Sequence, residues 1–496
     1  MSGNLKKYQL FIDGKWVEAN SGKYFDTVYP YTAEPWAMAS EADATDVDRA
    51  VQSARAAFEG AWGATKPVDR AKLLNRFAEL IESNAERLAE IESRDNGKLL
   101  DESLGQIKYL PMFYRYFAGM ADKMFGQVLP LEKPNFFNYT VREPYGVIGL
   151  LTPWNSPLFI ASQCIAPALA SGNTIVLKPS EFTSISSLEF AALAVEAGFP
   201  PGVMNVVTGF GSPTGEALTS HPDVDKYCFV GGAATAKGVM ANLAKNIKPV
   251  CMELGGKSPV IVFEDANLDN AANGVIKGIF SATGQTCIAA SRLLVQENIA
   301  DKFVDMIMDR IKSIRYGDPM DKKTELAPLS SERHLQRMKD FVKAGLDEGA
   351  TLVCGGGQPK DASLGKGYFF EPTIFKNVNP KAFIAREDAF GPVLCVFTFK
   401  DEEDAIRQAN DTEYGLCAGI WTQSPTRGIR MAGRIRAGMI WVNNARLASY
   451  ASPFGGYKMS GIGRYGGPDA MLEFTQVKAV WIETSDAAIP NPFLLF

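Results

Sequence analysis

The sequence predicts an α/β protein in which two successive regions each contain a parallel sheet. Three observations support this prediction: a length of 496 residues, a hydrophobic fraction of 46%, and short apolar runs that alternate with helical ones. Regular alternation of strand and helix is typical of βαβ units, whose strands run parallel with helices on the faces of the sheet. At roughly 150 residues per domain, the length indicates about three domains.

The N-terminal part of the chain is predicted to be a short strand pair followed by helices. Residues 9–17 have the pattern of two strands that turn at Asp13-Gly14. Apolar residues at helical spacing predict one helix from Ala44 and a second amphipathic run over residues 73–91 that stops at Gly97. These helices carry no residues that suggest chemistry, and we expect them to cover a sheet.

From Gly146 onward the pattern changes to short apolar runs separated by helical ones. The predicted strands cover residues 146–151, 174–177, 203–207, 227–230 and 259–263, and the predicted helices cover 158–169, 184–197 and 271–280. A second alternating region, with strands at 292–295, 393–399, 418–421 and 439–442, follows. Because parallel sheets bind ligands at the carboxyl ends of their strands, the residues that follow the strands are the candidates. The last strand, residues 476–483, is expected to form an arm that pairs with another subunit.

Charge and hydropathy argue against nucleic-acid and membrane partners. The formal net charge is -5, with acids and bases interspersed and no basic stripe. No apolar run approaches the roughly 18 residues that span a bilayer. Residues 1–10 contain Lys6 and Lys7 without a following apolar segment. We therefore expect a cytoplasmic protein that acts on a small molecule.

One of the cysteines stands apart from the others. The chain has 7 cysteines, an odd number without a C-x-x-C pair, which argues against a disulfide framework and against a structural metal site. Most lie in apolar runs, where inert buried thiols are expected. Cys287 instead follows a polar, glycine-containing loop, where a neighbouring group can activate its thiolate. The only histidines are His221 and His334, so a carboxylate is the favoured base.

Two glycine-rich turns follow predicted strands. Gly209, Gly211 and Gly215 form one of them, and Gly231 and Gly232 form the other. Each opens a helix, where backbone N–H groups can bind a pyrophosphate. The first turn differs by one residue from the G-x-G-x-x-G dinucleotide fingerprint, and a purely structural role for these glycines is the alternative.

Charged residues also lie at the predicted strand ends. Lys178 can donate to ribose hydroxyls, and Glu181 can accept from the 2′-hydroxyl, which favours NAD over NADP. The alternative is a solvated pair at the start of a helix. Glu253 lies between an apolar run and two glycines, where burial would raise its pKa toward the range of a general base.

Several motifs together resemble the NAD(P)-dependent aldehyde dehydrogenase superfamily, of the hydrolytic, non-acylating type. They occur in the family's order: Asn155 in Pro-Trp-Asn, Lys178 in Lys-Pro-Ser-Glu, Glu253 in Glu-Leu-Gly-Gly-Lys, and Cys287 in Gly-Gln-Thr-Cys. The interval between the last two (287 − 253 = 34 residues) also fits. Residues 453–461 match the C-terminal signature, and the resemblance extends over nearly the whole chain.

The resemblance implies a Rossmann-like cofactor domain, a second α/β catalytic domain and a small β oligomerisation arm. By this resemblance residues 1–124 and 145–255 correspond to the NAD-binding domain, and residues 256–455 correspond to the catalytic domain. Residues 125–144 and 475–496 correspond to the bridging arm. A homodimer or homotetramer is implied.

The implied mechanism is oxidation of an aldehyde to the acid. The Cys287 thiolate attacks the carbonyl carbon, and the Asn155 side-chain amide and the Cys287 backbone N–H hold the oxyanion. After hydride transfer to NAD, with NADP as the alternative, Glu253 activates the water that hydrolyses the thioester. The implied cofactor contacts are Leu151, Thr152, Pro153, Trp154, Lys178, Ser180, Glu181, Gly211, Gly215, Phe229, Gly231, Gly232, Thr235, Leu254, Asp388 and Phe390.

The chain departs from the family pattern at several of these places. Gly232 stands where a serine is frequent, so a hydroxyl contact to the pyrophosphate is missing. Asp388 stands where a glutamate usually binds the nicotinamide ribose, and Tyr465 stands where a glutamate is frequent. The shorter Asp388 implies a looser or water-bridged contact. Tyr465 removes an alternative base and strengthens Glu253.

The implied substrate pocket is polar. Its residues are Ser156, Gln163, Thr286, Ile288, Arg446 and Ala448. Ser156 and Gln163 stand where many members have large aromatic residues. Together with one guanidinium near the pocket mouth, they suggest an aldehyde with a carboxylate, as in a semialdehyde acid, or with another polar tail. The alternative for Arg446 is a structural salt bridge. Two rival functions are a CoA-acylating dehydrogenase and a non-catalytic, crystallin-like structural protein.

Overall fold

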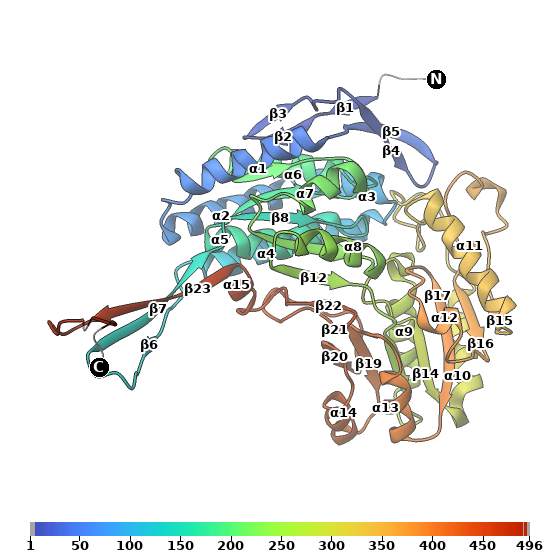
Figure 1. The fold of residues 1–496 in the computed structure, drawn as a ribbon. Coiled ribbons are helices and arrows are strands. Elements are labelled where there is room, and N and C mark those ends of the chain that lie inside the picture. Colours follow the sequence, from blue (N-terminus) through green and yellow to red (C-terminus); the bar gives the residue numbers. More distant parts are fainter. Residues whose placement is uncertain (1–4, 490, 494–496) are drawn as a thin grey trace.

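The computed structural model describes residues 5–489 and 491–493 (Figure 1). The predicted segments 1–124 and 475–496 therefore lie partly outside the described residues. Two large sheets and a projecting arm make up the molecule, and the predicted α/β fold class is confirmed. No described helix is long and apolar enough to cross a membrane.

The first large sheet is parallel at its centre. Its order is β22-β12-β11-β8-β9-β10-β2-β3. Strands β12, β11, β8, β9 and β10 run parallel, whereas β22 and β2 join antiparallel. The bounds are β22 Gly461–Ile462, β12 Val250–Leu254, β11 Lys226–Gly231, β8 Val147–Leu151, β9 Thr174–Lys178, β10 Met204–Val206, β2 Leu10–Ile12 and β3 Lys15–Val17. The predicted hairpin at Asp13-Gly14 joins the last two.

Helices cover both faces of this sheet because alternate strand residues point to opposite sides. On β8, Val147 packs with one group of helices and Ile148 with the other. The first group is α1 (Ala44–Glu59), α7 (Glu216–Thr219) and α8 (Ala233–Ala244). The second is α2 (Pro67–Ser83), α3 (Ala85–Asn96), α4 (Leu100–Ala118), α5 (Pro157–Ser171), α6 (Ile185–Glu196) and α15 (Ala470–Glu473).

The second large sheet is also mostly parallel and is buried on both faces. Its order is β15-β16-β17-β14-β13-β19-β20, with only β15 antiparallel. The bounds are β15 Thr351–Cys354, β16 Thr373–Lys376, β17 Val393–Phe399, β14 Arg292–Gln296, β13 Pro259–Val262, β19 Cys417–Trp421 and β20 Met439–Val442. Helices α9 (Leu268–Ile279) and α10 (Ala300–Ile311) cover one face. Helices α11 (Glu332–Asp347), α12 (Phe383–Arg386), α13 (Glu402–Asn410) and α14 (Pro425–Ala432) cover the other.

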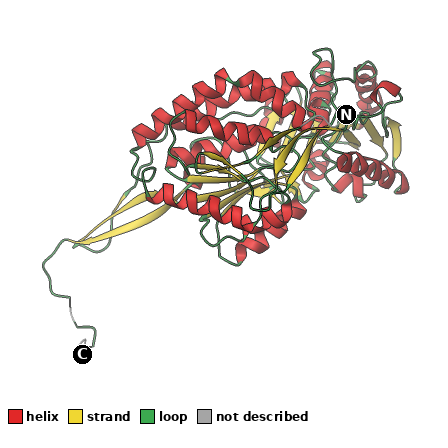
Figure 2. Cartoon of the chain, turned by 90° about the horizontal axis from the view of Figure 1, so that it is seen from above, coloured by secondary structure: helices red, strands yellow, loops and turns green. Residues whose placement is uncertain are grey.

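Smaller sheets complete the fold. Strands β1 (Lys6–Tyr8), β5 (Glu34–Ser40) and β4 (Tyr24–Tyr29) form one, and β18 (Tyr414–Gly415) pairs with β21 (Tyr457–Lys458). The arm contains β6 (Val128–Leu129), β7 (Phe136–Pro144) and β23 (Thr475–Glu483), and Figure 2 shows it projecting from the body. The predicted last strand pairs antiparallel with β7 of its own chain. Its other edge has no strand partner among the described residues.

The helices before the first sheet differ from the prediction. The run predicted over residues 73–97 is two helices, because Asn84 ends α2 and its side chain donates to the Leu80 carbonyl, 2.9 Å away. Gly97 ends α3 in the left-handed conformation, as its position predicts (φ 75°). Helix α4, which contains Pro111 and Gly105, was not predicted, since both residues are signals against a helix interior. Strand β12, which carries Glu253, was not predicted either.

Candidate active site

The loop that presents Cys287 is held in an unfavourable backbone conformation. After α9, Ala282 and Thr283 have positive φ angles of 51° and 53°. Such angles are costly for residues other than glycine and persist only where surrounding contacts enforce them. Glu102 Oε1 on α4 accepts from the Ala282 N–H (3.1 Å), and the Thr283 hydroxyl donates to the Ala327 carbonyl (2.8 Å). The position of the partly exposed Cys287 is therefore set by contacts far away in the sequence.

Glu253 lies on β12 with its side chain buried. The residue is 3% exposed, and neither carboxyl oxygen has a hydrogen-bond partner among the described residues. Burial raises the pKa of this carboxyl well above its usual value, and nearby Arg464 only partly opposes the rise. A side chain at Gly455 would overlap Glu253 Oε1, so glycine is required there. A carboxyl whose pKa is raised by burial is a stronger base than an exposed one, which suits the role of a general base.

Cys287 and Glu253 lie within electrostatic range of each other. Burial raises the pKa of the Cys287 thiol to about 12, and the charges of Glu253 and Asp388 contribute to the rise. The Arg446 guanidinium acts in the opposite direction. A Cβ placed on Gly256 would lie 3.6 Å from the Cys287 carbonyl oxygen, so the segment that follows Glu253 packs against the cysteine backbone. The fold thus brings the predicted nucleophile and base together.

Asn155 follows β8 and is 7% exposed. Its Oδ1 is buried without a partner, and its Nδ2 donates to no described residue, so the amide donor is free. The hydroxyl of Thr152, three positions earlier (155 − 152 = 3), is also buried and unpartnered. Unsatisfied buried polar atoms are rare in folded proteins, and two of them in the segment that follows the carboxyl end of β8 fit a ligand site.

The predicted cofactor residues gather at the carboxyl ends of adjacent parallel strands. Leu151, Gly231 and Leu254 end β8, β11 and β12, and Lys178 ends β9. Phe229 lies on β11, Thr235 lies in the first turn of α8, and Pro153, Ser180, Glu181, Gly211, Gly215 and Gly232 lie in the loops and turns after the strands. Beside Gly211 and Gly232 there is open space where a side chain would lie, as a cradle for a ligand requires.

Lys178 is buried, which contradicts the alternative of a solvated ion pair. Its side chain is 5% exposed, and its ammonium donates to the Pro179 carbonyl (3.0 Å). Burial lowers its pKa to about 8, and nearby Glu181 opposes that change. The stem of Lys178 lies 3.6 Å from the position of a Cβ on Gly215, so the lysine and the glycine turn are neighbours. Glu181 precedes α6 and is not in its first turn.

An aromatic cluster joins the two large sheets. The Trp154 ring lies 5.2 Å from the His334 ring and 5.4 Å from the Phe390 ring. His334 on α11 is hydrogen-bonded through Nε2 to the Phe390 carbonyl (2.9 Å), and burial lowers its pKa to about 4. Asp388 Oδ1 accepts from the Phe390 N–H (3.0 Å), and burial raises the pKa of Asp388 to about 6. No motif in the sequence indicates that His334 belongs to this site.

The predicted substrate residues differ in exposure and in their contacts. Thr286 and Ile288 flank Cys287 and are partly exposed, Gln163 on α5 is buried, and Ala448 is exposed. Arg446 donates to the Lys277 carbonyl (3.2 Å) but forms no salt bridge with any described residue, so the predicted structural ion pair is absent. Ser156 accepts a hydrogen bond from Lys98 (3.2 Å). The sequence did not predict Lys98, nor Glu102, which lies close enough to Arg446 to affect its pKa.

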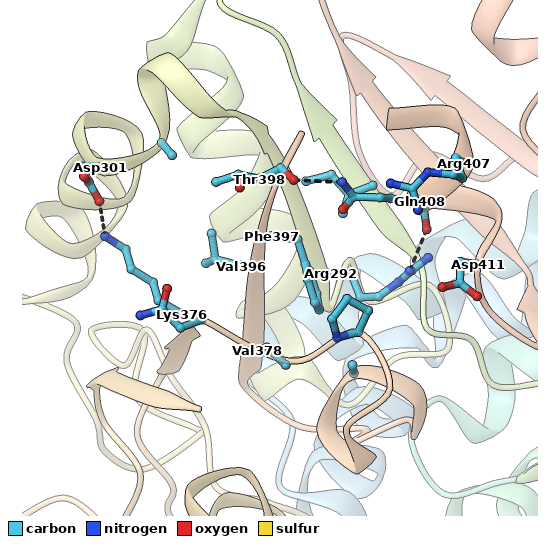
Figure 3. A pocket seen from close by; sticks show the side chains of 15 residues that line it. Arg292, Asp301, Lys376, Val378, Val396, Phe397, Thr398, Arg407, Gln408 and Asp411 are labelled. Carbon is cyan, nitrogen blue, oxygen red and sulfur yellow. Dashed lines mark hydrogen bonds and ion pairs between the residues drawn. The ribbon is translucent and has the colours of Figure 1, made fainter. Parts of the chain in front are cut away.

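Figure 3 shows a separate cavity of about 360 Å³ in the second sheet region. None of the predicted site residues lines it. Its charged side chains already have partners: Lys376 pairs with Asp301 (2.7 Å), and Arg292 donates to the Gln408 carbonyl (3.1 Å). Among the described residues, no group of three or more His, Cys, Asp or Glu could hold a metal ion.

The parallel sheets, the thiol and the buried carboxyl fit the class of α/β enzymes that work through a cysteine. A sequence profile described as the aldehyde dehydrogenase family matches residues 16–480. The chain belongs to this family.

Named relatives and a solved structure agree with this assignment. The chain is 44% identical to the (Z)-2-((N-methylformamido)methylene)-5-hydroxybutyrolactone dehydrogenase of Acinetobacter baylyi, over 99% of this chain and 100% of the relative. It is 42% identical to the betaine aldehyde dehydrogenase of Bacillus subtilis, over 97% and 98% of the two chains. The NAD+ complex of an aldehyde dehydrogenase from Bacillus cereus has a TM-score of 0.94 and 42% identity, with 97% of each chain covered.

The charges around Cys287 lead to a prediction for its reactivity. Because burial and two carboxylates raise the thiol pKa, we expect alkylation by iodoacetamide in the absence of ligands to rise about tenfold per pH unit below pH 9. Glu253→Gln removes an anion, so the titration should move to lower pH. Arg446→Met removes a cation, so it should move to higher pH. A shift to higher pH for Glu253→Gln, or to lower pH for Arg446→Met, would contradict the described charge arrangement.

Proposed function

We propose that the protein oxidises an aldehyde to the carboxylic acid, with NAD as the electron acceptor and water as the second substrate. One observation carries the proposal: the Glu253 carboxyl is buried, without hydrogen-bond partners among the described residues, and within electrostatic range of the Cys287 thiol. Membership of the aldehyde dehydrogenase family supports it. A water bound to this carboxyl would give it a hydrogen-bond partner and would supply the second substrate of the reaction.

The first half of the reaction forms a bond to sulfur. The Cys287 thiolate adds to the carbonyl carbon of the aldehyde, and the carbonyl oxygen becomes an oxyanion. The Asn155 Nδ2, which donates to no described residue, and the Cys287 backbone N–H donate to that oxygen. Bound NAD supplies a two-electron acceptor for the hydride of this carbon, which leaves a thioester on Cys287.

The second half of the reaction releases the acid. Glu253 takes a proton from a water molecule, whose oxygen adds to the thioester carbon. The carbon–sulfur bond then breaks, and Cys287 leaves as the thiolate. The high pKa that burial gives to Glu253 makes it a stronger base than an exposed carboxylate, which is what this proton transfer requires. A carboxyl in this place favours water over CoA as the acceptor of the acyl group.

The residues present fit a dinucleotide. Among the described residues, the buried Lys178 ammonium has a single acceptor and the Thr152 hydroxyl has no partner. Space is open beside Gly211 and Gly232. We propose that Lys178 and Glu181 hold the adenosine ribose, that the two glycine turns hold the pyrophosphate, and that Asp388 holds the nicotinamide ribose. A carboxylate near the 2′-hydroxyl disfavours a 2′-phosphate, so NAD is preferred to NADP. The NAD+ complex of the similar Bacillus cereus structure supports this choice.

Variants of the two central residues test the mechanism. We expect Cys287→Ala to form no NADH, because no covalent intermediate can form. We expect Glu253→Gln to give one rapid turnover of NADH and then to stall, because the thioester has no base for its hydrolysis. Stopped-flow absorbance of NADH and mass spectrometry of the acylated enzyme distinguish the two. Steady turnover of Glu253→Gln at the wild-type rate would reject Glu253 as the base.

The substrate we propose is an aldehyde that carries a carboxylate. Arg446 lies within electrostatic range of Cys287, and only one hydrogen bond of its guanidinium is to a described residue. Its remaining N–H groups can donate to a carboxylate as a fork. Ser156 and Gln163 add polar groups close in sequence to Asn155.

Removal of the guanidinium tests this substrate class. With succinic semialdehyde as the substrate, we expect Arg446→Met to lower kcat/KM by about 10- to 100-fold, the range for a lost hydrogen bond to a charged group. With butanal, a neutral aldehyde of the same length, we expect a change of less than about threefold. Equal losses with both aldehydes would show that Arg446 does not act on the substrate carboxylate.

We propose that the protein is a cytoplasmic homodimer or homotetramer assembled through residues 125–144 and 475–496. Residues 1–124 and 145–255 would serve the cofactor, and residues 256–455 would carry the catalytic cysteine. On the arm, Val477, Trp481 and Ile482 are 56%, 52% and 44% exposed. An exposed apolar strand with a free edge is a site for pairing with another chain. All cysteines are free thiols, which fits a reducing compartment.

A charge on the arm should prevent assembly. In light scattering we expect the wild type to have the mass of a dimer or a tetramer of the 54.0 kDa chain. Val477→Glu with Trp481→Glu should shift the protein to the single-chain mass with an unchanged circular dichroism spectrum. Val68→Glu is the matched control, because Val68 on α2 is 54% exposed but lies outside the arm. A double variant that keeps the wild-type mass would refute the assignment of the arm.

A further inference from the structure

The segment that carries Asn155 is held by three buried polar residues at the end of α3. Asn96 Nδ2 donates to the carbonyl oxygens of Trp154 (3.3 Å) and Asn155 (3.5 Å). Lys98 and Glu92 contact the next residues: the Lys98 ammonium donates to the Ser156 hydroxyl (3.2 Å), and Glu92 Oε2 accepts from the Leu158 N–H (3.3 Å). Successive residues from Trp154 to Ser156, between β8 and α5, and Leu158 at the start of α5 are therefore each held by a hydrogen bond to one of these three side chains.

The three side chains also hold one another. Lys98 forms an ion pair with Glu92 Oε1 (3.0 Å), and its backbone N–H donates to Asn96 Oδ1 (2.9 Å). The ammonium donates as well to Gln106 Oε1 on α4 (2.7 Å), so all three of its N–H groups have acceptors. Glu92, Asn96 and Lys98 are 0%, 2% and 5% exposed. We refer to these three residues as the α3 polar cluster.

An ion pair at this depth needs an explanation other than stability. Removing two charges from water costs several kcal/mol per ion, and an apolar pair of similar volume is often equally stable. The turn that places Lys98 is constrained in addition, because a Cβ on Gly97 would lie 2.9 Å from Pro30. Buried and fully satisfied polar networks fix one conformation of the groups they contact. The groups contacted here are the backbone and neighbours of Asn155.

The side chain of Asn155 cannot fix its own direction. Its Oδ1 makes no hydrogen bond, and no described residue accepts from its Nδ2. The aim of the amide therefore depends on the backbone of residues 154–156. An oxyanion donor must lie within a few tenths of an ångström of its place to be effective, since displacement of about 1 Å can cost 100-fold in rate.

We propose that the α3 polar cluster positions Asn155 for the oxyanion. Glu92, Asn96 and Lys98 touch no reacting atom and act through the backbone of residues 154–158 and through the Ser156 hydroxyl. The inference rests on the proposed function insofar as Asn155 is the oxyanion donor. It extends that function to a pair of helices whose sequence shows no catalytic motif.

Acylation of Cys287 by 4-nitrophenyl acetate tests this proposal without the cofactor. The ester carbonyl also becomes an oxyanion when the thiolate attacks, and 4-nitrophenolate leaves as the acyl group bonds to sulfur. The burst of 4-nitrophenolate measures this step. We expect Lys98→Met and Asn96→Ala to slow the burst by about 10- to 100-fold, approaching the 100- to 1,000-fold expected for Asn155→Ala.

A double-mutant cycle separates positioning from a general loss of structure. If the cluster acts through Asn155, adding Lys98→Met or Asn96→Ala to Asn155→Ala should slow the burst by less than about threefold further. Alkylation of Cys287 by iodoacetamide forms no oxyanion, so its rate should stay within about twofold of the wild type in both single variants. Losses that multiply in the Asn155→Ala background, or an equal loss of alkylation, would overturn the proposal.

A matched control is available at the opposite end of the same sheet. Arg55 donates to Asp225 (2.6 Å), which lies before β11, whereas Asn155 follows the end of β8. Arg55→Met should leave the burst unchanged.

If Lys98→Met fails to fold, Asn96→Ala is tested alone. Absence of a burst in the wild type would also overturn the proposal, because Cys287 would then form no oxyanion. NADH formation by the wild type from aldehydes reports separately on the proposed function.

Discussion

The burial of the Glu253 carboxyl without a partner is the constraint on which the rest of the site depends. A buried carboxyl costs free energy unless it is neutral or satisfied, so the surrounding structure must supply the compensation. Strand β12 holds the residue by parallel pairing with β11 on one side and by antiparallel pairing with β22 on the other. Glycines at 455 and 461 let the C-terminal segment approach the strand closely. Glu253 is thus embedded in the sheet and is 3% exposed.

Cys287 is positioned by a loop and not by a strand of a sheet. It lies on an irregular loop whose positive φ angles are maintained by contacts to other parts of the chain. Glu102 of α4 and the carbonyl of Ala327 supply two of these contacts. The aromatic contact between Trp154 and Phe390 adds a link between the two sheet regions. Because Cys287 and Glu253, the proposed nucleophile and base, come from different parts of the chain, only the joined sheet regions bring them within electrostatic range.

Unsatisfied and fully satisfied polar groups have opposite roles around this site. Thr152, Asn155 and Glu253 each have a buried polar atom without a partner among the described residues, as expected for groups that bind a ligand. The cluster of Glu92, Asn96 and Lys98 behind them is completely paired. Paired polar groups that hold unpaired donors in place favour preorganised catalysis. The donors then need no reorganisation as charge develops on the substrate.

Much of the fold could be predicted because its signals are local. Apolar runs of strand length separated by helical ones predict parallel sheets, and the predicted strands and helices from Gly146 onward occur close to their expected bounds. The motifs around Asn155, Glu253 and Cys287 are also local, since each lies within a few adjacent residues. The family is confirmed by a profile match over residues 16–480.

What the sequence by itself determined is the alternation of strands and helices from Gly146 onward, the family, and the residues whose chemistry suits a nucleophile, a base and an amide donor. Only the tertiary structure decided that Lys178 is buried, that Arg446 has no ion pair among the described residues, and that His334, Glu102 and Lys98 belong near the site. Burial and pairing depend on which segments meet in space. No local pattern in the turn between α3 and α4 distinguishes a lysine that faces water from one that contacts the segment after β8.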